Sequence, residues 1–412
     1  MDTTTSIKSR YDALKAEGLA IDMTRGKPSA KQLDLSLPML DLVGSNDYKA
    51  ADGTDCRNYG GLDGLPEAKK LFAEFLEVQP SEIIIGGNSS LALMHDTVCR
   101  ALLHGVQDNT PWLLQNPKFI CPSPGYDRHF KVCEHHKIDM ITVDNHSDGP
   151  DMDEVERLVA EDERIKGIWI VPKYGNPTGS VCSEETIKRL ATMKTAATDF
   201  RIFWDNAYVV HHIDDSSQEL SDILTKCKEA GNPDRVFIFG STSKITFAGA
   251  GIAMMAGSEA NMDWVREHLG KQTIGPDKLN QLRHLRFFPT IQHVYDHMEK
   301  HSEILRPKFN AVLEILEREL GGKQLAAWTN PKGGYFISLN TNPGKAKRVV
   351  ALAAEAGVKL TGAGAAFPYR NDPQDKNIRI APSLPPIEDL KKATELLTVC
   401  IKMADAENNN HS

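Results

Sequence analysis

Short apolar runs alternate with helical stretches through most of the first 260 residues, and this alternation limits the possible folds. The runs are rich in aliphatic and β-branched residues, and the stretches between most of them space their apolar residues as a helix does. We predict strands at residues 82–85, 118–121, 140–143, 167–171, 201–204 and 236–239. Such a pattern predicts an α/β fold whose mixed, mostly parallel sheet is sandwiched by helices.

The remainder of the chain predicts a second, smaller α+β domain. After Gly257 helical patterning dominates, and its part from about Val294 is long enough to bridge two domains. Two further strands are expected near residues 335–339 and 377–381, with a helix at 346–356 between them. At 412 residues the chain exceeds one average domain. We therefore expect an N-terminal segment of the small domain at 1–48, a large cofactor-binding domain at 49–298 and the rest of the small domain at 299–412.

Clusters of small and polar residues follow five of the predicted strands. In sheets of this kind ligands bind at the carboxyl ends of the strands, so all five clusters should line one rim. The first cluster lies between a strand and a helix, where free backbone N–H groups favour a phosphate, although tight turns use glycine in any case. The clusters are Gly87-Asn88-Ser89, Pro124-Gly125-Tyr126, Asn176-Pro177-Thr178-Gly179, Asp205-Asn206-Ala207-Tyr208 and Ser241-Thr242-Ser243-Lys244.

Lys244 and Asp205 are the candidates for covalent chemistry. A partly desolvated lysine loses some of its preference for the charged form and can form a Schiff base with an aldehyde. An aldehyde on a pyridine ring would need a carboxylate that keeps the ring nitrogen protonated, and Asp205 ends an apolar strand. Taken alone, Lys244 could be a surface lysine and Asp205 a helix cap or turn residue.

Other side chains of the rim could complete a pyridine site. Asn176 and Tyr208 are neutral donors for a phenolic oxygen, and Tyr126 offers a ring for stacking. Ser241 and Ser243 suit a phosphate.

Two further positions could bind a substrate carboxylate. Arg379 enters an otherwise apolar strand, where it would either bind a carboxylate through two N–H groups or form a structural ion pair with a buried acid. Gly26 lies between Arg25 and Lys27, in a loop that could receive a carboxylate or remain a solvated turn.

Composition excludes several classes of protein. The net charge of −8 shows no basic footprint, so nucleic acid is not an expected partner. The seven cysteines contain no Cys-x-x-Cys pair and predict free thiols in a reducing compartment, by default the cytoplasm. No apolar run is long enough to span a bilayer. A metal site at His211-His212-Ile213-Asp214-Asp215 is set aside because adjacent histidines point apart on a strand, and His135 and His136 are set aside on the same ground.

Taken together, these motifs resemble the class I aminotransferases of pyridoxal 5′-phosphate (PLP) fold type I. The similarity runs from about Met23 to Ser383 and is closest to the bacterial aspartate aminotransferase type Ic subgroup. It implies PLP as cofactor, amino-acid and 2-oxo-acid substrates, and a homodimer with shared active sites. It also implies that Tyr59 reaches the cofactor phosphate of the neighbouring subunit. The strings that carry it are Arg25-Gly26-Lys27-Pro28-Ser29, Arg57-Asn58-Tyr59-Gly60, Pro124-Gly125-Tyr126-Asp127-Arg128-His129-Phe130, Asn176-Pro177-Thr178-Gly179, Asp205-Asn206-Ala207-Tyr208, Ser241-Thr242-Ser243-Lys244, Gln272-Thr273-Ile274-Gly275-Pro276-Asp277-Lys278 and Asn377-Ile378-Arg379.

The implied activity is the transfer of an amino group from L-aspartate to 2-oxoglutarate. The family usually carries an arginine for the cofactor phosphate shortly after the Schiff-base lysine, but residues 245–252 contain no cation. The cation for the distal carboxylate of aspartate is also open among Arg25, Lys27, Lys271 and Lys278. Alternatives that keep the cofactor are an aminotransferase for aromatic or small apolar amino acids and a β-lyase. A PLP-sensing regulatory module is the alternative from another class of protein.

Overall fold

The computed structural model describes residues 4–214 and 219–407 and contains one large sheet of eight strands. The strand order is β2-β9-β8-β7-β6-β3-β4-β5. Neighbouring strands from β8 to β4 are parallel, whereas β9 runs antiparallel to both β2 and β8, and β5 runs antiparallel to β4. The bounds are β2 (Ile83–Ile85), β3 (Lys118–Ser123), β4 (Asp139–His146), β5 (Gly149–Pro150), β6 (Ile165–Ile170), β7 (Arg201–Asp205), β8 (Val236–Ser241) and β9 (Ala253–Gly257).

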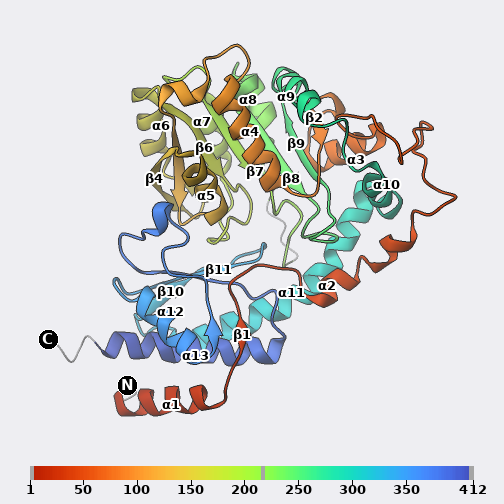
Figure 1. The fold of residues 1–412 in the computed structure, drawn as a ribbon. Helices are drawn as coiled ribbons and strands as arrows, with labels where there is room; N and C mark the ends of the chain where they lie inside the picture. The colour runs from red at the N-terminus through yellow and green to blue at the C-terminus, as the bar shows by residue number, and fades with distance from the viewer. Residues whose placement is uncertain (1–3, 215–218, 408–412) are drawn as a thin grey trace.

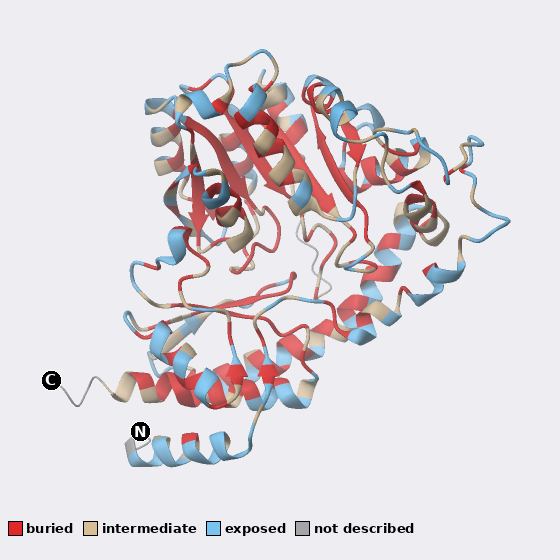
Figure 2. Cartoon of the chain, in the orientation of Figure 1, coloured by how far each residue is buried: buried red, intermediate tan, exposed pale blue. Residues whose placement is uncertain are grey.

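Helices cover both faces of this sheet, and all of its strands except the partly exposed β4 are buried along most of their length (Figures 1 and 2). Because side chains alternate along a strand, Ile202 and Trp204 of β7 join one hydrophobic cluster and Phe203 joins the cluster on the opposite face. The helices and 3₁₀ turns of this part are α3 (Pro66–Leu76), η2 (Pro80–Glu82), α4 (Ser90–His104), η3 (Trp112–Gln115), α5 (Asp127–His136), α6 (Met152–Glu161), α7 (Glu184–Thr192), α8 (Ile223–Glu229), η4 (Pro233–Arg235), α9 (Glu259–Gln272) and α10 (Lys278–Phe287).

A second, smaller sheet forms the lower part of the molecule in Figure 1. Its antiparallel order is β10-β11-β13, and β1 pairs separately with β12. A third hydrophobic cluster joins these strands to α1, α11, α12 and α13. The bounds are α1 (Thr4–Ala16), β1 (Ile21–Asp22), α2 (Ala30–Asp34), η1 (Leu37–Asp41), β10 (Ala326–Trp328), β11 (Ile337–Thr341), α12 (Ala346–Glu355), β12 (Val358–Lys359), η5 (Pro368–Arg370), β13 (Asn377–Ile380) and α13 (Ile387–Ala406).

The helix α11 (Ile291–Leu320) joins the two parts. Its 30 residues are about 45 Å long, and Figure 1 shows it running from beside α10 to the second sheet. Val294 and Met298 near its start pack in the large-sheet core, whereas Leu305 and Phe309 pack in the small-sheet core. The proposed domain boundaries at 48/49 and 298/299 remain a prediction.

The predicted fold class is confirmed, but two strands of the large sheet, β5 and β9, were missed, as were the short strands β1, β10 and β12. The six strands expected in the large sheet all form, but β9 lies between β2 and β8 in a segment to which we had assigned no strand. Its sequence, Ala-Met-Met-Ala-Gly, has no β-branched residue. Within the described residues, no helix is both long enough and apolar enough to cross a membrane.

Candidate active site

A cavity of ≈ 560 Å³ opens where the large sheet meets the smaller part of the molecule. It brings together residues from eight separate segments of the chain, including most of the predicted rim. The predicted residues that line it are Gly26, Tyr126, Asn176, Tyr208, Lys244 and Arg379.

Lys244 lies just past the end of β8 in a tightly bonded turn. The backbone N–H groups of Ile245 and Thr246 donate to Thr242 O, and the Thr242 hydroxyl accepts from Ile252 N at 2.8 Å. The Lys244 Nζ lies 4.8 Å from the ring centroid of Tyr208. Burial lowers the pKa of Lys244 below its ordinary value, and the Asp205 carboxylate opposes only part of that effect. A larger share of this lysine is therefore a neutral, nucleophilic amine than for a lysine in water.

Asp205 is the last residue of β7, the strand next to β8, and it is buried. Its Oδ2 accepts a hydrogen bond from His129 Nε2 at 2.9 Å, and the His129 ring stacks on Trp169 at 4.5 Å. Its Oδ1 is buried and has no hydrogen-bond partner among the described residues. A buried carboxylate oxygen without a hydrogen-bond donor suits the N–H of a protonated heterocycle. The chain thus fits the ring nitrogen of PLP at this position.

Two tyrosines and an asparagine surround the same space. Burial raises the pKa of both Tyr126 and Tyr208 far above the ordinary value, and the Asp205 charge adds to it, so both rings keep their hydroxyl proton. Asn176 accepts from Arg379 Nη1 at 3.2 Å through its Oδ1, which leaves its amide N–H groups free to donate. All three side chains can therefore offer a proton to an anionic oxygen.

Arg379, in β13, carries the ion pair that the sequence left open. Its Nη1 lies 2.9 Å from Asp127 Oδ1, and its guanidinium lies 4.9 Å from the Phe336 ring centroid. Asp127 is the first residue of α5 and directly follows Tyr126. Arg379 therefore links the small sheet to the side of the cavity that carries Tyr126. Arg379 still lines the cavity, and an incoming carboxylate would meet a guanidinium that Asp127 has already oriented.

The candidate phosphate residues meet at the start of α4. The Ser243 hydroxyl donates to Asn88 O at 3.1 Å, and Asn88 Nδ2 donates to Gly249 O at 3.0 Å. Ser89 caps α4 by accepting from Ala92 N, and the space beside Gly87 is open. Ser241 closes β8 a few residues before Lys244. The binding of a phosphate by these residues remains a prediction.

The four cations considered for a distal carboxylate fall into two groups. Arg25 and Lys27 line the cavity, whereas Lys271 is exposed and pairs with Glu267 on α9. Lys278 is buried and donates to Asn58 O and Gly60 O at 2.7 and 2.6 Å, which supports the loop of Tyr59. Tyr59 itself is 80% exposed and does not line this cavity in its own chain.

Several residues of the site carried no separate signal in the sequence. His129 and Asp127 lie in the Pro124–Phe130 motif. Only the fold shows that His129 contacts Asp205 and that Asp127 contacts Arg379. Arg128 and Lys131 add two cations to the cavity wall. A helix that starts at this wall places successive polar side chains near it, and this is the signal that could have found them.

The histidines that we set aside as metal ligands behave in two ways. His212 Nδ1 lies 2.6 Å from the Tyr174 hydroxyl, His211 is buried, and Asp215 lies outside the described residues. Burial and the Lys244 charge hold the pKa of His211 well below its ordinary value. The argument that adjacent histidines diverge was wrong for His135 and His136, because they end a helix and both approach His95.

Comparison with known proteins identifies the family. The model of the aspartate aminotransferase family matches residues 1–411. The chain belongs to this family. It is 49% identical over 403 residues to an aspartate aminotransferase of Corynebacterium glutamicum, covering 97% of this chain and 93% of the relative. The crystal structure of an aspartate transaminase from the same organism superposes with a TM-score of 0.96 at 48% identity, covering 98% and 96% of the two chains.

A more distant structure shows the fold alone. The α-aminoadipate aminotransferase of Thermus thermophilus, complexed with N-(5′-phosphopyridoxyl)-L-leucine, has a TM-score of 0.76 at 20% identity and covers 97% of each chain. The resemblance stated from the motifs is confirmed, and the chain is an aminotransferase of PLP fold type I. The roles of the individual site residues remain predictions.

Proposed function

We propose that the chain uses PLP to transfer the amino group of L-aspartate to 2-oxoglutarate, giving oxaloacetate and L-glutamate. The unpartnered Oδ1 of buried Asp205, one strand away from the Lys244 amine that lines the cavity, carries this proposal. These two groups supply the acid and the amine that the cofactor requires, and the family match supports the reaction class. The choice of L-aspartate as amino donor and 2-oxoglutarate as acceptor rests on the positive charge of the cavity.

PLP, when bound, supplies an aldehyde for the amine of Lys244 and a ring that draws electrons away from the substrate Cα. Asp205 holds the ring nitrogen in its protonated form, and His129 fixes the direction of that carboxylate. Tyr208 and Asn176 donate to the ring oxygen. The neutral amine of Lys244 would take up the proton that leaves the substrate Cα and release it again as a general acid. Its lowered pKa favours the neutral form that this step needs.

The charge of the cavity favours a substrate with two carboxylates. Arg379 is proposed to bind the α-carboxylate. Arg25, Lys27, Arg128 and Lys131 also line the cavity, and its one acid, Asp127, is already paired with Arg379. An aromatic or small apolar side chain would leave this surplus of positive charge unpaired. The geometry therefore disfavours the aromatic and small apolar alternatives.

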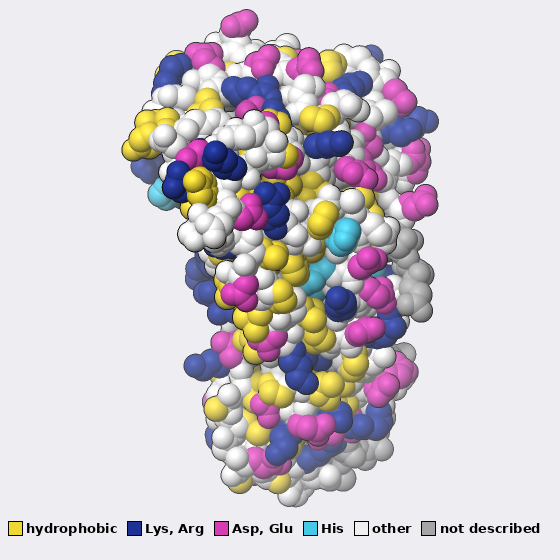
Figure 3. Space-filling model, turned by 90° about the vertical axis from the view of Figure 1, so that its right-hand side faces the viewer, with side chains coloured by type: hydrophobic (Ala, Val, Ile, Leu, Met, Phe, Trp, Pro, Cys, Tyr) yellow, Lys and Arg dark blue, Asp and Glu magenta, His cyan; other side chains and the backbone are white. Residues whose placement is uncertain are grey.

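A homodimer with shared active sites is part of the proposal. Exposed apolar side chains lie on η1 and on the loop before α10, at 50% exposure for Leu37, 55% for Leu40 and 63% for Ile274. Figure 3 shows the face that carries these segments, where hydrophobic side chains run between interspersed charges. Such a patch is typical of a surface that a partner covers. Tyr59, on the adjoining loop, is then free to reach the partner's cofactor phosphate.

The proposed location is the cytoplasm. All seven cysteines are free thiols in the structure, and six of them are buried. Unpaired thiols fit a reducing compartment.

The proposal is tested with PLP-loaded protein and a panel of amino donors. We expect L-aspartate to abolish the visible absorbance of the lysine-bound cofactor and 2-oxoglutarate to restore it. Lys244→Ala should lose this band and at least about 10³-fold of turnover, whereas the control Lys271→Ala, at an exposed lysine of α9, should keep both. Transamination retained by Lys244→Ala would refute the assignment. A preference for aromatic donors would refute the proposed substrate, and pyruvate or ammonia release from aspartate analogues without an acceptor would indicate the β-lyase.

A further inference from the structure

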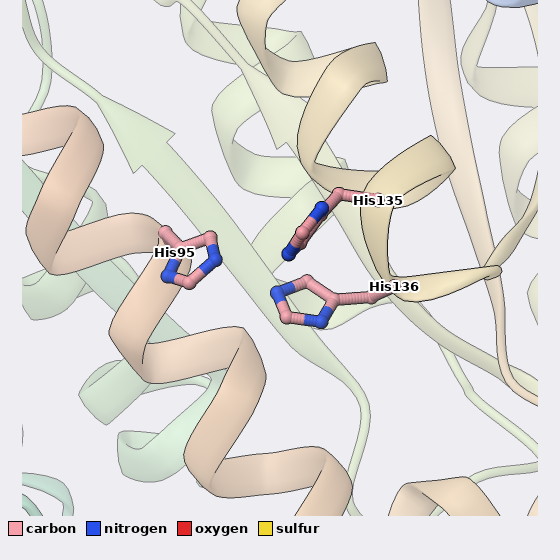
Figure 4. A group of neighbouring side chains, drawn as sticks. All are labelled: His95, His135 and His136. Atoms are coloured by element: carbon pink, nitrogen blue, oxygen red, sulfur yellow. The ribbon is translucent and has the colours of Figure 1, made fainter.

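Three histidines outside the active site converge on one point between α4 and α5. His95 lies in the second turn of α4, and His135 and His136 are the last two residues of α5. Their candidate ligand nitrogens all lie within 4.8 Å of one another, with ring centroids 4.7 to 5.6 Å apart. Figure 4 shows that each ring turns a nitrogen toward the space that the three share.

The geometry points to a binding site for a divalent transition metal such as Zn²⁺, formed by His95, His135 and His136. Imidazole nitrogens are common ligands of zinc, copper and nickel, and three protein ligands with an open fourth position form a familiar zinc site. Metal–nitrogen distances of about 2.0–2.1 Å in a tetrahedral site place the nitrogens about 3.3 Å apart. The rings must therefore close by at most about 1.5 Å. His135 is exposed, so its side chain has room to rotate toward the other two.

The hydrogen bonds around the cluster leave the required nitrogens available. His95 Nδ1 lies 3.4 Å from Asp96 Oδ1, and the second oxygen of Asp96 accepts from Gln272 Nε2 at 2.8 Å. A carboxylate on Nδ1 fixes the tautomer that presents Nε2 to a metal, as the outer partners of zinc-bound histidines do. His136 Nε2 is buried and has no hydrogen-bond partner among the described residues. A metal would satisfy this nitrogen.

The alternative explanation is that the three histidine rings simply pack against one another. Packing alone explains contacts between ring faces and edges, but it leaves the buried nitrogen of His136 without a partner, which costs about 1–3 kcal/mol in general. Burial and the two neighbouring imidazoles lower the pKa of His136, which favours the neutral ring that a metal ligand needs.

A metal bound by these histidines would link α4 and α5, two helices that both begin beside the proposed cofactor site. The first turn of α4 follows the proposed phosphate loop at Ser89, and α5 starts directly after Tyr126. This metal site lies about 13 Å along α5 from Tyr126, given a rise of about 1.5 Å per residue. The site is therefore structural and distinct from the reaction chemistry. It does not depend on the proposed substrate.

The test is titration of the tag-free, PLP-loaded protein with Zn²⁺, after removal of unbound PLP, which itself binds metals. We expect one Zn²⁺ per chain by equilibrium dialysis, a melting temperature that rises with Zn²⁺ concentration, and a visible absorption spectrum of tetrahedral type when Co²⁺ replaces Zn²⁺. His135→Asn and His95→Asn should each weaken binding at least about tenfold, because even the loss of an outer partner costs that much.

The matched control is His104→Asn. His104, at the end of α4, stacks on His268 at 4.7 Å, so this variant also removes one ring of a histidine pair. It should bind Zn²⁺ as the unaltered chain does. Correct folding of each variant is checked by its PLP absorbance. The inference is overturned if the unaltered protein binds no metal, or if its affinity survives both His95→Asn and His135→Asn.

Discussion

Replacement of His129 by phenylalanine tests whether Asp205 is a buried charge held by one partner. Both side chains are 2% exposed, and the bond from His129 is the one hydrogen bond that the Asp205 side chain makes among the described residues. Phenylalanine keeps a ring against Trp169 but cannot donate. The carboxylate would then be buried with neither oxygen bonded.

The expected cost follows from this burial. Removing one partner of a fully buried ion pair typically lowers the free energy of unfolding by about 3–5 kcal/mol. The stacking on Trp169, worth about 0.5–1.5 kcal/mol, should largely persist. We therefore expect about 3–4 kcal/mol for His129→Phe in the cofactor-free protein. Adding Asp205→Asn removes the charge that needs the partner and should recover about 2 kcal/mol.

The assay is urea denaturation of the cofactor-free single and double variants, followed by tryptophan fluorescence, since Trp169 and Trp204 flank the pair. Cofactor binding is measured in parallel, and we expect His129→Phe to weaken it. A loss below about 1 kcal/mol for His129→Phe, or no recovery in the double variant, would refute the buried-charge argument.

Three further outcomes are expected. Gly26→Ala should raise KM several-fold, because its Cβ would lie 2.6 Å from Phe336 Cζ and displace the ring under Arg379, whereas Gly44→Ala, with open space beside it, should leave steady-state kinetics unchanged. Arg379→Lys should lower kcat/KM by about 10–100-fold for both amino donor and acceptor, since an ammonium cannot bind a carboxylate through two parallel hydrogen bonds; equal kinetics would exclude its proposed role. Hydrogen bonds from Arg10 and Lys402 lower the pKa of Glu319 from 4.5 to about 2, so their stabilisation is complete above pH 4.5 and is lost as the pH falls toward 2. Glu319→Gln should remove about 1 kcal/mol of acid-sensitive stability, measured as hydrogen exchange of α1 between pH 5 and pH 3, and an unchanged pH dependence would contradict this cause.

The sequence predicted most of the large sheet because most of its strands are buried on both faces. Runs such as Ile202-Phe203-Trp204 contain no polar residue that could face water, so their composition alone predicts that they are buried. β9 was missed because methionine, alanine and glycine, which give little strand signal in the sequence, can form a strand when both faces of the sheet are buried. Propensity gives a weak signal where burial decides.

The candidate site was predicted to the extent that it follows strand ends. Asp205 ends β7 and Lys244 follows the end of the neighbouring strand β8, and the rule for parallel sheets brings them together. The contact of Asp127 with Arg379 joins residues 252 positions apart across the two parts of the molecule. No local pattern encodes such a contact, so the ion pair and the cavity cations required the fold. The approach of His135 and His136 to His95 also joins separate helices, and it too required the fold.

The electrostatics of the site explain why the cofactor and the protein need each other. A lysine with a lowered pKa gives up part of its positive charge, and that leaves Asp205 with less compensation than its burial demands. His129 serves one carboxylate oxygen, and the other has no partner among the described residues. A ligand that places a positive N–H beside this oxygen and accepts the lysine amine meets both needs at once. The same arrangement predicts that loss of either group weakens the binding of the cofactor as well as the chemistry.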